Sequence, residues 1–310
     1  GRASSGALDG KGKFLTGAKL EPGQDAETLD PRPYIWRVIG EEIPIEVLSS
    51  KPWQAGLSLV ADRFQDGRVL LAGDAVHLFT PTGGFGMNTG VGDAENLGWK
   101  LAAWHHGWAG ENLVSSYEGE RRPVAIRNLA QSYALAQGKS SLTVPPNIED
   151  ETPEGEAIRA EFGKRTEEVL AEEYFCMGIQ LGARYDSSPL VSAETEAGSP
   201  PVSDPYEYIP TAYPGGRAPH AWLADGTALF DHFGKGFTLL ILAGDDDSQA
   251  FVDAAAVKGV PVSVYDATDA NLRDLYEADL AIIRPDQYVA WRGDVLPPDA
   301  AALVDRLRGA

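Results

Sequence analysis

The sequence predicts an α/β protein in which helices and strands mix along the chain. Three observations support this prediction. An apolar run over residues 68–73 ends in a Gly-Asp pair and is followed by a glycine-rich loop and a long helical pattern. Residues 152–182 are rich in Glu and Ala, with apolar residues at helical spacing. From Arg217 onward, short apolar runs alternate with helical patterns, which is typical of a small α/β domain.

The first part of the chain, up to about Gln137, combines strands and helices. Continuous or alternating apolar residues predict the strands, and apolar residues at helical intervals predict the helices. We expect strands at residues 43–50, 55–62 and 68–73 and helices at Asn88–His106 and Leu113–Gln137. Residues 152–182 then predict two helices or one long helix.

The stretch SPPVSDPYEYIPTAYPGGRAPH follows these helices and predicts a linker, because proline and glycine break regular structure. After it we expect a strand, a helix, three strands and a final helix. These elements are predicted at residues 236–244, 248–257, 260–267, 278–285, 287–293 and 297–309.

Composition excludes several classes of protein. A formal net charge of −20 argues against nucleic acid or an anionic membrane as a partner. Cys176 is the only cysteine in the sequence, which excludes an internal disulfide and a cysteine-based zinc site. No apolar stretch approaches the roughly 20 residues of a membrane-spanning helix, and the N-terminal residues show no signal-peptide pattern. We therefore expect a soluble protein of about two domains in the cytoplasm.

Asp74 is the first candidate binding residue. A buried strand that ends in Gly73 and Asp74 would deliver a carboxylate to the carboxyl edge of a sheet, where open α/β folds bind ligands. The loop over residues 81–86 has glycine at three of its six positions, so its amides can approach a flat or anionic ligand. Asn88 or Thr89 is expected to cap the next helix, whose positive N-terminal end stabilises negative charge.

Glycines at positions 90, 92 and 98 indicate close packing of this helix against a ligand or a strand, because glycine destabilises a helix interior by up to about 1 kcal/mol. Two simpler interpretations of these motifs compete with a binding site. A dinucleotide-binding G-x-G-x-x-G fingerprint is rejected, because residues 87–89 lack the third glycine. A turn capped by Asp74 accounts for an isolated Gly-Asp pair but not for the ordered motifs around it.

The motifs between residues 73 and 102 read Gly-Asp-Ala-x-His, then Pro, then Gly-Gly-x-Gly-x-Asn, then Asp-Ala-x-Asn-Leu-x-Trp-Lys-Leu-Ala. This series resembles the second flavin-binding signature of the FAD-dependent aromatic-ring monooxygenases, the single-component flavoprotein hydroxylases related to phenol hydroxylase. The likeness extends through VADRFQDGR and SYEGERRPVA to IIRPDQYVAWR near the end of the chain.

The resemblance implies a set of FAD-binding residues. Asp74 would hydrogen-bond the ribityl and pyrophosphate portion, and backbone amides would contact the pyrimidine edge of the isoalloxazine ring. Pro81, the implied catalytic residue, would lie beside the ring face on which a C4a-hydroperoxide forms. The implied cofactor-binding residues are Gly73, Asp74, Pro81, Gly84, Gly86, Met87 and Asn88.

The resemblance also implies a reaction. In the family, NADPH (or NADH) reduces FAD, O2 adds to the flavin, and one oxygen is transferred to a phenolic or related aromatic ring without a metal. Trp53, Phe79 and Phe85 indicate only an apolar wall for such a ring, so no residue is assigned to the substrate. Enzymes of this kind are commonly homodimers.

The implied fold is the C-terminal part of a flavin monooxygenase FAD/substrate fold followed by a thioredoxin-like α/β domain. That last domain has no cysteine and is therefore expected to be structural. The G-x-G-x-x-G segment that binds the ADP half of FAD is absent, so we expect the C-terminal portion of a longer enzyme, with the missing N-terminal portion as its partner. The expected segments are 1–64 (end of the substrate-domain sheet), 65–195 (flavin-binding segment and helices), 196–216 (linker) and 217–310 (thioredoxin-like domain).

Other residues are expected to have structural roles. His77 is predicted to pack beside the flavin, with acid–base chemistry as the alternative. His105 and His106 are expected to complement the dipole at a helix C-terminus, and residues 118–122 to form a charged, solvated face that supports the fold. Packing in a core or an interface is expected for Trp99, Trp104 and Trp108.

Two alternatives to the hydroxylase remain open at this stage. In the first alternative, the chain is a non-catalytic C-terminal fragment with a structural or oligomerisation role. In the second, it is part of a halogenase or epoxidase on the same scaffold. Fold-level analogy does not separate these chemistries.

Overall fold

The computed structural model describes residues 3–20, 23–25, 27–53, 57–192, 200–244 and 248–310. Its backbone divides into two compact units, Gly1–Ala55 and Gly56–Ala310, which are described separately. The candidate site lies in the second unit. No helix among the described residues combines the length and the apolar character needed to cross a membrane.

The first unit consists of a hairpin and a short helix. Strands β1 (Ala3–Ala7) and β2 (Phe14–Ala18) pair antiparallel, and helix α1 (Arg32–Ile39) follows. Gly40 ends α1 with a φ of 85°, which glycine adopts readily. The strand predicted at residues 43–50 was wrong, because this segment has no regular secondary structure. A strand needs a neighbour for its backbone hydrogen bonds, and no described segment pairs with this one.

The second unit begins with two short pairs of antiparallel strands. Strand β3 (Leu59–Val60) pairs with β6 (His77–Leu78), and β4 (Gln65–Asp66) pairs with β5 (Val69–Leu70). The strands predicted at residues 55–62 and 68–73 are therefore present only in part, and residues 55 and 56 lie outside the described residues.

Asp74 does not follow a buried strand, which corrects the sequence-based prediction. Val69 and Leu71 are 62% and 41% exposed. Strand β5 pairs only with β4 among the described strands, so the larger sheet expected around it is absent from this part of the chain. Asp74 lies instead in the 3-10 turn η1 (Gly73–Ala75).

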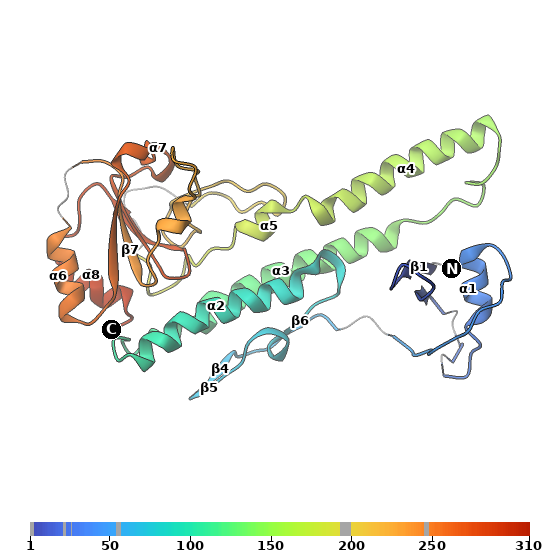
Figure 1. The fold of residues 1–310 in the computed structure, drawn as a ribbon, viewed down its shortest axis with the longest axis horizontal. Coiled ribbons are helices and arrows are strands. Elements are labelled where there is room, and N and C mark those ends of the chain that lie inside the picture. Colours follow the sequence, from blue (N-terminus) through green and yellow to red (C-terminus); the bar gives the residue numbers. More distant parts are fainter. Residues whose placement is uncertain (1–2, 21–22, 26, 54–56, 193–199, 245–247) are drawn as a thin grey trace. The chain divides into compact units, whose positions relative to one another are not determined.

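Two long helices form the centre of the second unit. Helices α2 (Phe85–His105) and α3 (Ser116–Ser141) lie side by side, as Figure 1 shows. Both predicted helices are confirmed. The region predicted as two helices or one long helix forms two, α4 (Pro153–Tyr174) and α5 (Met177–Leu181).

The C-terminal part is a four-stranded sheet with helices on it. The order of its strands is β10-β9-β7-β8, with β7 and β8 parallel and the other neighbours antiparallel. This arrangement agrees with the thioredoxin-like domain that the resemblance implied. Its elements are β7 (Phe237–Ile241), α6 (Gln249–Val257), β8 (Val262–Asp266), α7 (Arg273–Tyr276), β9 (Leu280–Ile283), β10 (Val289–Gly293) and α8 (Ala300–Leu307).

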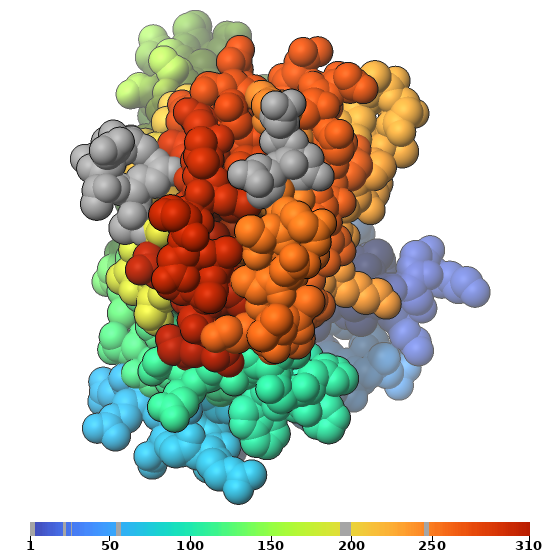
Figure 2. Space-filling view, turned by 90° about the vertical axis from the view of Figure 1, so that its left-hand side faces the viewer, coloured from blue at the N-terminus to red at the C-terminus, as the bar shows by residue number. Residues whose placement is uncertain are grey.

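The alternation of side chains along β7 builds two cores on the two faces of this sheet. Leu239 and Ile241 belong to the core beneath α6 and α8, which also contains Ala103 from the last turn of α2 and Trp108 just after it. Leu240 and Leu242 belong to the core on the opposite face. Helices α6 and α8, in orange and red, lie side by side on the surface in Figure 2. The thioredoxin-like part is thus packed directly against the end of α2.

Candidate functional site

The turn that carries Asp74 presents its side chain to solvent. Gly73 precedes it with a φ of 58°, a left-handed conformation that favours glycine. The Asp74 carboxylate is exposed and makes no hydrogen bond or ion pair with the residues that the structure describes. A carboxylate held on a tight turn in this way is available to accept hydrogen bonds from the hydroxyl groups of a ligand.

A second carboxylate, Asp93 in α2, fixes this turn from behind. Its Oδ2 accepts hydrogen bonds from the Gly73 N–H at 3.0 Å and from His77 Nε2 at 2.7 Å, and its Oδ1 accepts one from Arg121 Nε at 2.8 Å. Asp93 is fully buried. Burial alone would raise the pKa of this carboxyl, but the hydrogen bond from His77 and the charge of Arg121 hold the pKa below its usual value.

Two of the three helix glycines explain how α2 approaches the turn so closely. A Cβ at Gly90 would lie 3.2 Å from the Gly73 Cα, and a Cβ at Gly92 would lie 2.8 Å from a guanidinium nitrogen of Arg121. Close packing is therefore confirmed at these positions, but its partners are a turn and a buried cation, where a ligand or a strand was expected. The prediction was wrong at Gly98, where a Cβ would meet nothing within 4 Å.

The glycine-rich loop is anchored on its inner side. Gly83 and Gly84 have φ values of 84° and 65°, so both positions require a left-handed backbone. The Gly83 N–H donates to Glu173 Oε1 at 2.9 Å, and Ser132 Oγ donates to the Thr82 carbonyl oxygen at 3.0 Å. The amide of Gly83 is thus occupied by α4, and the loop has a defined shape before any ligand binds.

Helix α2 begins earlier than the sequence suggested. Gly84 is its N-cap, whereas Asn88 and Thr89 were expected to cap it. Both side chains instead donate back along the helix, Asn88 Nδ2 to the Gly84 carbonyl at 2.8 Å and Thr89 Oγ1 to the Phe85 carbonyl at 2.8 Å. The predicted cofactor contacts Gly86 and Met87 therefore lie in the first turn of α2, where backbone N–H groups lack intrahelical partners.

The predicted cofactor-binding residues are accessible although their neighbours are buried. Met87 is 76% exposed, whereas Phe85 and Thr89 beside it are buried. Gly73 and Gly86 are half-buried. The others, namely Asp74, Pro81, Gly84, Met87 and Asn88, are exposed. Phe85, expected as part of an apolar wall, packs into a core with Leu135 and Ile179.

The charged residues at 118–122 support the fold but are not a solvated face. Glu120 and Arg121 are buried, and the Glu118 carboxylate accepts the Phe64 N–H at 2.7 Å. Asp93 and Glu173 were missed as parts of the site. An aspartate beside a glycine in the middle of a helix is unfavourable by intrinsic propensity, and this was the available signal for Asp93.

The aromatic predictions hold in part. Trp108 is buried in the core below the sheet and partly buried Trp99 stacks on it, with ring centroids 6.3 Å apart, as expected, but Trp104 is 61% exposed. His77 is buried between aromatic rings, 5.1 Å from that of Phe79, and its role toward a flavin stays a prediction. His105 ends α2 as expected.

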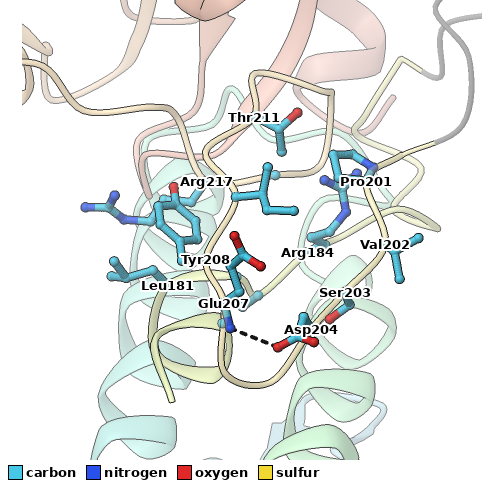
Figure 3. Close-up of a pocket in the computed structure, with 15 residues that line it drawn as sticks. Leu181, Arg184, Pro201, Val202, Ser203, Asp204, Glu207, Tyr208, Thr211 and Arg217 are labelled. Carbon is cyan, nitrogen blue, oxygen red and sulfur yellow. Dashed lines mark hydrogen bonds between the residues drawn. The ribbon is translucent and has the colours of Figure 1, made fainter. Parts of the chain in front are cut away.

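A small hollow outside this region is lined by α5 and the three residues after it, by residues 201–204, 207–209 and 211, and by Gly216 and Arg217 (Figure 3). In it the Asp204 carboxylate accepts the Glu207 N–H at 2.8 Å. None of its lining residues belongs to the predicted cofactor set. Within the described part of the chain, no group of three or more His, Cys, Asp and Glu side chains is arranged to hold a metal.

Two parts of the chain match known protein families. Residues 38–132 match the FAD binding domain family, and residues 211–310 match the C-terminal domain of the aromatic-ring hydroxylases. The first match contains the Asp74 turn, the glycine loop and Asp93. This chain belongs to the FAD-dependent aromatic-ring monooxygenases.

Individual relatives of this monooxygenase chain agree with the two domain matches. It is 38% identical to the FAD-dependent monooxygenase opdD of Penicillium oxalicum over 87% of this chain and 54% of that protein. It is 32% identical to the 4-methyl-5-nitrocatechol 5-monooxygenase of a Burkholderia species over 98% of this chain and 52% of that protein. The chain thus spans about half the length of these curated relatives.

Solved structures give the same result. The rebeccamycin biosynthetic enzyme RebC with reduced flavin matches with a TM-score of 0.84 and 41% identity, over 98% of this chain and 56% of that one. Aklavinone-11 hydroxylase in complex with FAD and aklavinone matches with a TM-score of 0.70 and 29% identity, over 96% of this chain and 54% of that one. The monooxygenase fold expected from the sequence is therefore confirmed.

Proposed function

We propose that this chain supplies the isoalloxazine side of an FAD site in an enzyme that hydroxylates a phenolic or related aromatic substrate, with NADPH or NADH as the reductant. The observation that carries the proposal is the Gly73–Asp74 turn. Its carboxylate is exposed and unpartnered among the described residues, while the Gly73 N–H beside it is held by buried Asp93.

The residues of the site fit a flavin. Asp74 has the acceptor atoms that ribityl hydroxyl groups need, and exposed Gly84, where a Cβ would meet nothing within 4 Å, lets a planar ring approach the loop without meeting a side chain. The first turn of α2 adds N–H donors and a partial positive charge, which favour an electron-rich ring edge. When bound, FAD supplies the redox chemistry that activates O2 for transfer to the substrate.

The protein's own residues would bind and orient the cofactor. Asp74 holds the chain that links ring and pyrophosphate, and the rigid, exposed Pro81 provides a wall beside the ring. The hydrogen bonds from Gly83 to Glu173 and from Ser132 to Thr82 keep the loop in one shape, so binding requires little reorganisation.

The substrate class follows from the relatives. The similar Burkholderia protein is a nitrocatechol monooxygenase and a similar Cupriavidus protein is a 2,4-dichlorophenol 6-monooxygenase, both named for phenolic compounds. An aromatic substrate together with O2 is therefore proposed here. A homodimer, and an N-terminal portion of the same enzyme that completes the site, belong to the same proposal.

The proposal is tested by titrating the purified chain with FAD and following flavin fluorescence, for the unaltered chain and for Asp74→Ala. Asp274→Ala is the matched control, because Asp274 is also exposed and lies in the C-terminal domain. We expect Asp74→Ala to weaken FAD binding at least about tenfold, the loss of roughly one charge-assisted hydrogen bond, with an unchanged urea midpoint. Equal FAD affinity in the two variants would refute the assigned site.

A further inference from the structure

A buried polar network leads from the turn Gly73–Ala75, which we call the cofactor turn, to the C-terminal domain. Besides its bond to Asp93, Arg121 donates from one terminal guanidinium nitrogen to the Tyr185 hydroxyl oxygen at 3.1 Å. A further nitrogen of the same guanidinium donates to the Thr89 carbonyl at 3.1 Å. Tyr185 lies in the segment after α5 and is only 3% exposed. The turn is therefore linked by two side chains to a residue outside the match to the FAD binding domain.

Tyr185 is in turn fixed by the C-terminal domain. Its ring stacks on that of Tyr288 with centroids 4.1 Å apart and planes inclined by 26°. The Arg284 guanidinium lies 5.1 Å from the centre of the same ring. Both contacts come from the turn between β9 and β10, so the position of Tyr185 depends on that turn.

Arg284 also binds α3 directly, at the residue before Arg121. It is 2% exposed and donates to both carboxylate oxygens of Glu120, at 2.7 and 2.8 Å, and to Asp286 at 2.7 Å. Glu120 directly precedes Arg121 in α3 and also accepts Lys100 Nζ at 2.7 Å. Buried charges of this kind tolerate few alternative geometries, because each lost contact leaves a desolvated charge without its partner.

We propose that the C-terminal thioredoxin-like domain fixes the cofactor turn through this network, with Tyr185 and Arg284 as positioning residues that act through Arg121 and Asp93. The proposal gives a role to a domain that contains no cysteine and therefore no thiol redox chemistry. Its consequence for FAD rests on the function proposed above, whereas the coupling to the turn does not.

The test uses Tyr185→Phe, which removes the hydroxyl that faces Arg121 and leaves the ring stack in place. Tyr276→Phe is the matched control. The Tyr276 hydroxyl is equally buried in the C-terminal domain and donates to the Pro219 carbonyl at 2.8 Å, with no contact to Arg121. Both variants lose one buried tyrosine hydroxyl, so a general loss of stability affects both alike.

Hydrogen–deuterium exchange is measured on the full chain for peptides that cover residues 70–80, with residues 237–241 of β7 as the internal reference. Tyr185→Phe is expected to speed exchange at residues 70–80 by at least about tenfold, the equivalent of one lost hydrogen bond to a charged group. Tyr276→Phe is expected to leave these residues at the rate of the unaltered chain. Equal exchange in the two variants overturns the inference.

FAD titration of the same two variants separates this inference from the proposed function. Weaker FAD binding in Tyr185→Phe alone, together with faster exchange at residues 70–80, supports both. Faster exchange with equal FAD affinity supports the coupling and counts against the cofactor assignment of the turn. A double variant with Asp93→Asn gives a second check, since the two changes should be non-additive if they act on one network.

Discussion

Replacement of Asp93 by asparagine tests whether a buried carboxylate holds the candidate cofactor turn. Three donors point at this side chain, from Gly73 and His77 to Oδ2 and from Arg121 to Oδ1. An asparagine keeps the shape but has one acceptor oxygen and one NH2 group. If the oxygen faces Arg121, the NH2 group meets the Gly73 amide and the imidazole. If the oxygen faces the turn, the NH2 group meets the guanidinium.

Either orientation leaves at least one buried donor facing another donor, and it leaves the charge of Arg121 without its carboxylate. Removal of one partner from a buried ion pair typically costs about 3–5 kcal/mol. Asp305 provides the control, because it also pairs with two cations, Lys258 and Arg308, but its side chain is 34% exposed. Asp305→Asn is therefore expected to cost no more than about 1 kcal/mol.

The assay is urea unfolding of both variants at pH 7 and at pH 3. The folded-state pKa of Asp93 lies below its usual value, and an unfolded aspartate titrates near a pKa of about 3.9. Its charge thus contributes stability that is complete above this unfolded pKa and is lost as the pH falls through the folded pKa. The difference between Asp93→Asn and the unaltered chain should shrink at low pH. A cost below about 1 kcal/mol at pH 7 would refute the argument.

Three further predictions follow from the packing. Gly98→Ala should raise the free energy of unfolding by about 0.5–1 kcal/mol, because a Cβ there meets nothing within 4 Å and alanine favours the helix; a lower urea midpoint would contradict this. Gly83→Ala should lower it by at least about 1–2 kcal/mol, because φ is 84° and the Cβ would lie 2.5 Å from the Phe85 ring; an unchanged midpoint would show that the loop relaxes freely. Trp99→Ala should cost about 3–5 kcal/mol and Trp104→Ala less than about 0.5, as measured by urea unfolding; similar losses would contradict the assigned burial.

The sequence predicted helices and the C-terminal sheet better than the strands before Asp74. Helices such as α2 satisfy their backbone hydrogen bonds within one segment, so a local pattern is sufficient to predict them. Strand β7 lies at the centre of its sheet between β8 and β9, and its continuous apolar run reflects burial on both faces. The run at residues 68–73 has the same pattern, but among the strands that the structure describes only β4 pairs with part of it. A pattern of buried residues predicts that a partner exists without identifying the partner.

The motif alone located Gly73, Asp74 and the glycine loop, but it did not show what supports them. Arg121 and Tyr185 are distant from Asp93 in sequence, and nothing local distinguishes Arg121 from a solvated arginine on a charged helix. Their roles depend on how α2, α3 and the segment after α5 pack together. The four segments expected from the sequence also stay a prediction. The backbone itself divides into two compact units, with the boundary after residue 55.

The two carboxylates near the turn have different roles because their surroundings differ. Asp93 is buried and saturated by three donors, so it is a fixed anchor with no remaining capacity for a ligand. Asp74 is exposed and has no partner among the described residues, and the amide of the preceding residue, Gly73, is bound to Asp93. The second role depends on the first. If Asp93 released the Gly73 amide, the turn would lose the hydrogen bond that fixes its backbone, and the Asp74 carboxylate would no longer be held in one position for a ligand.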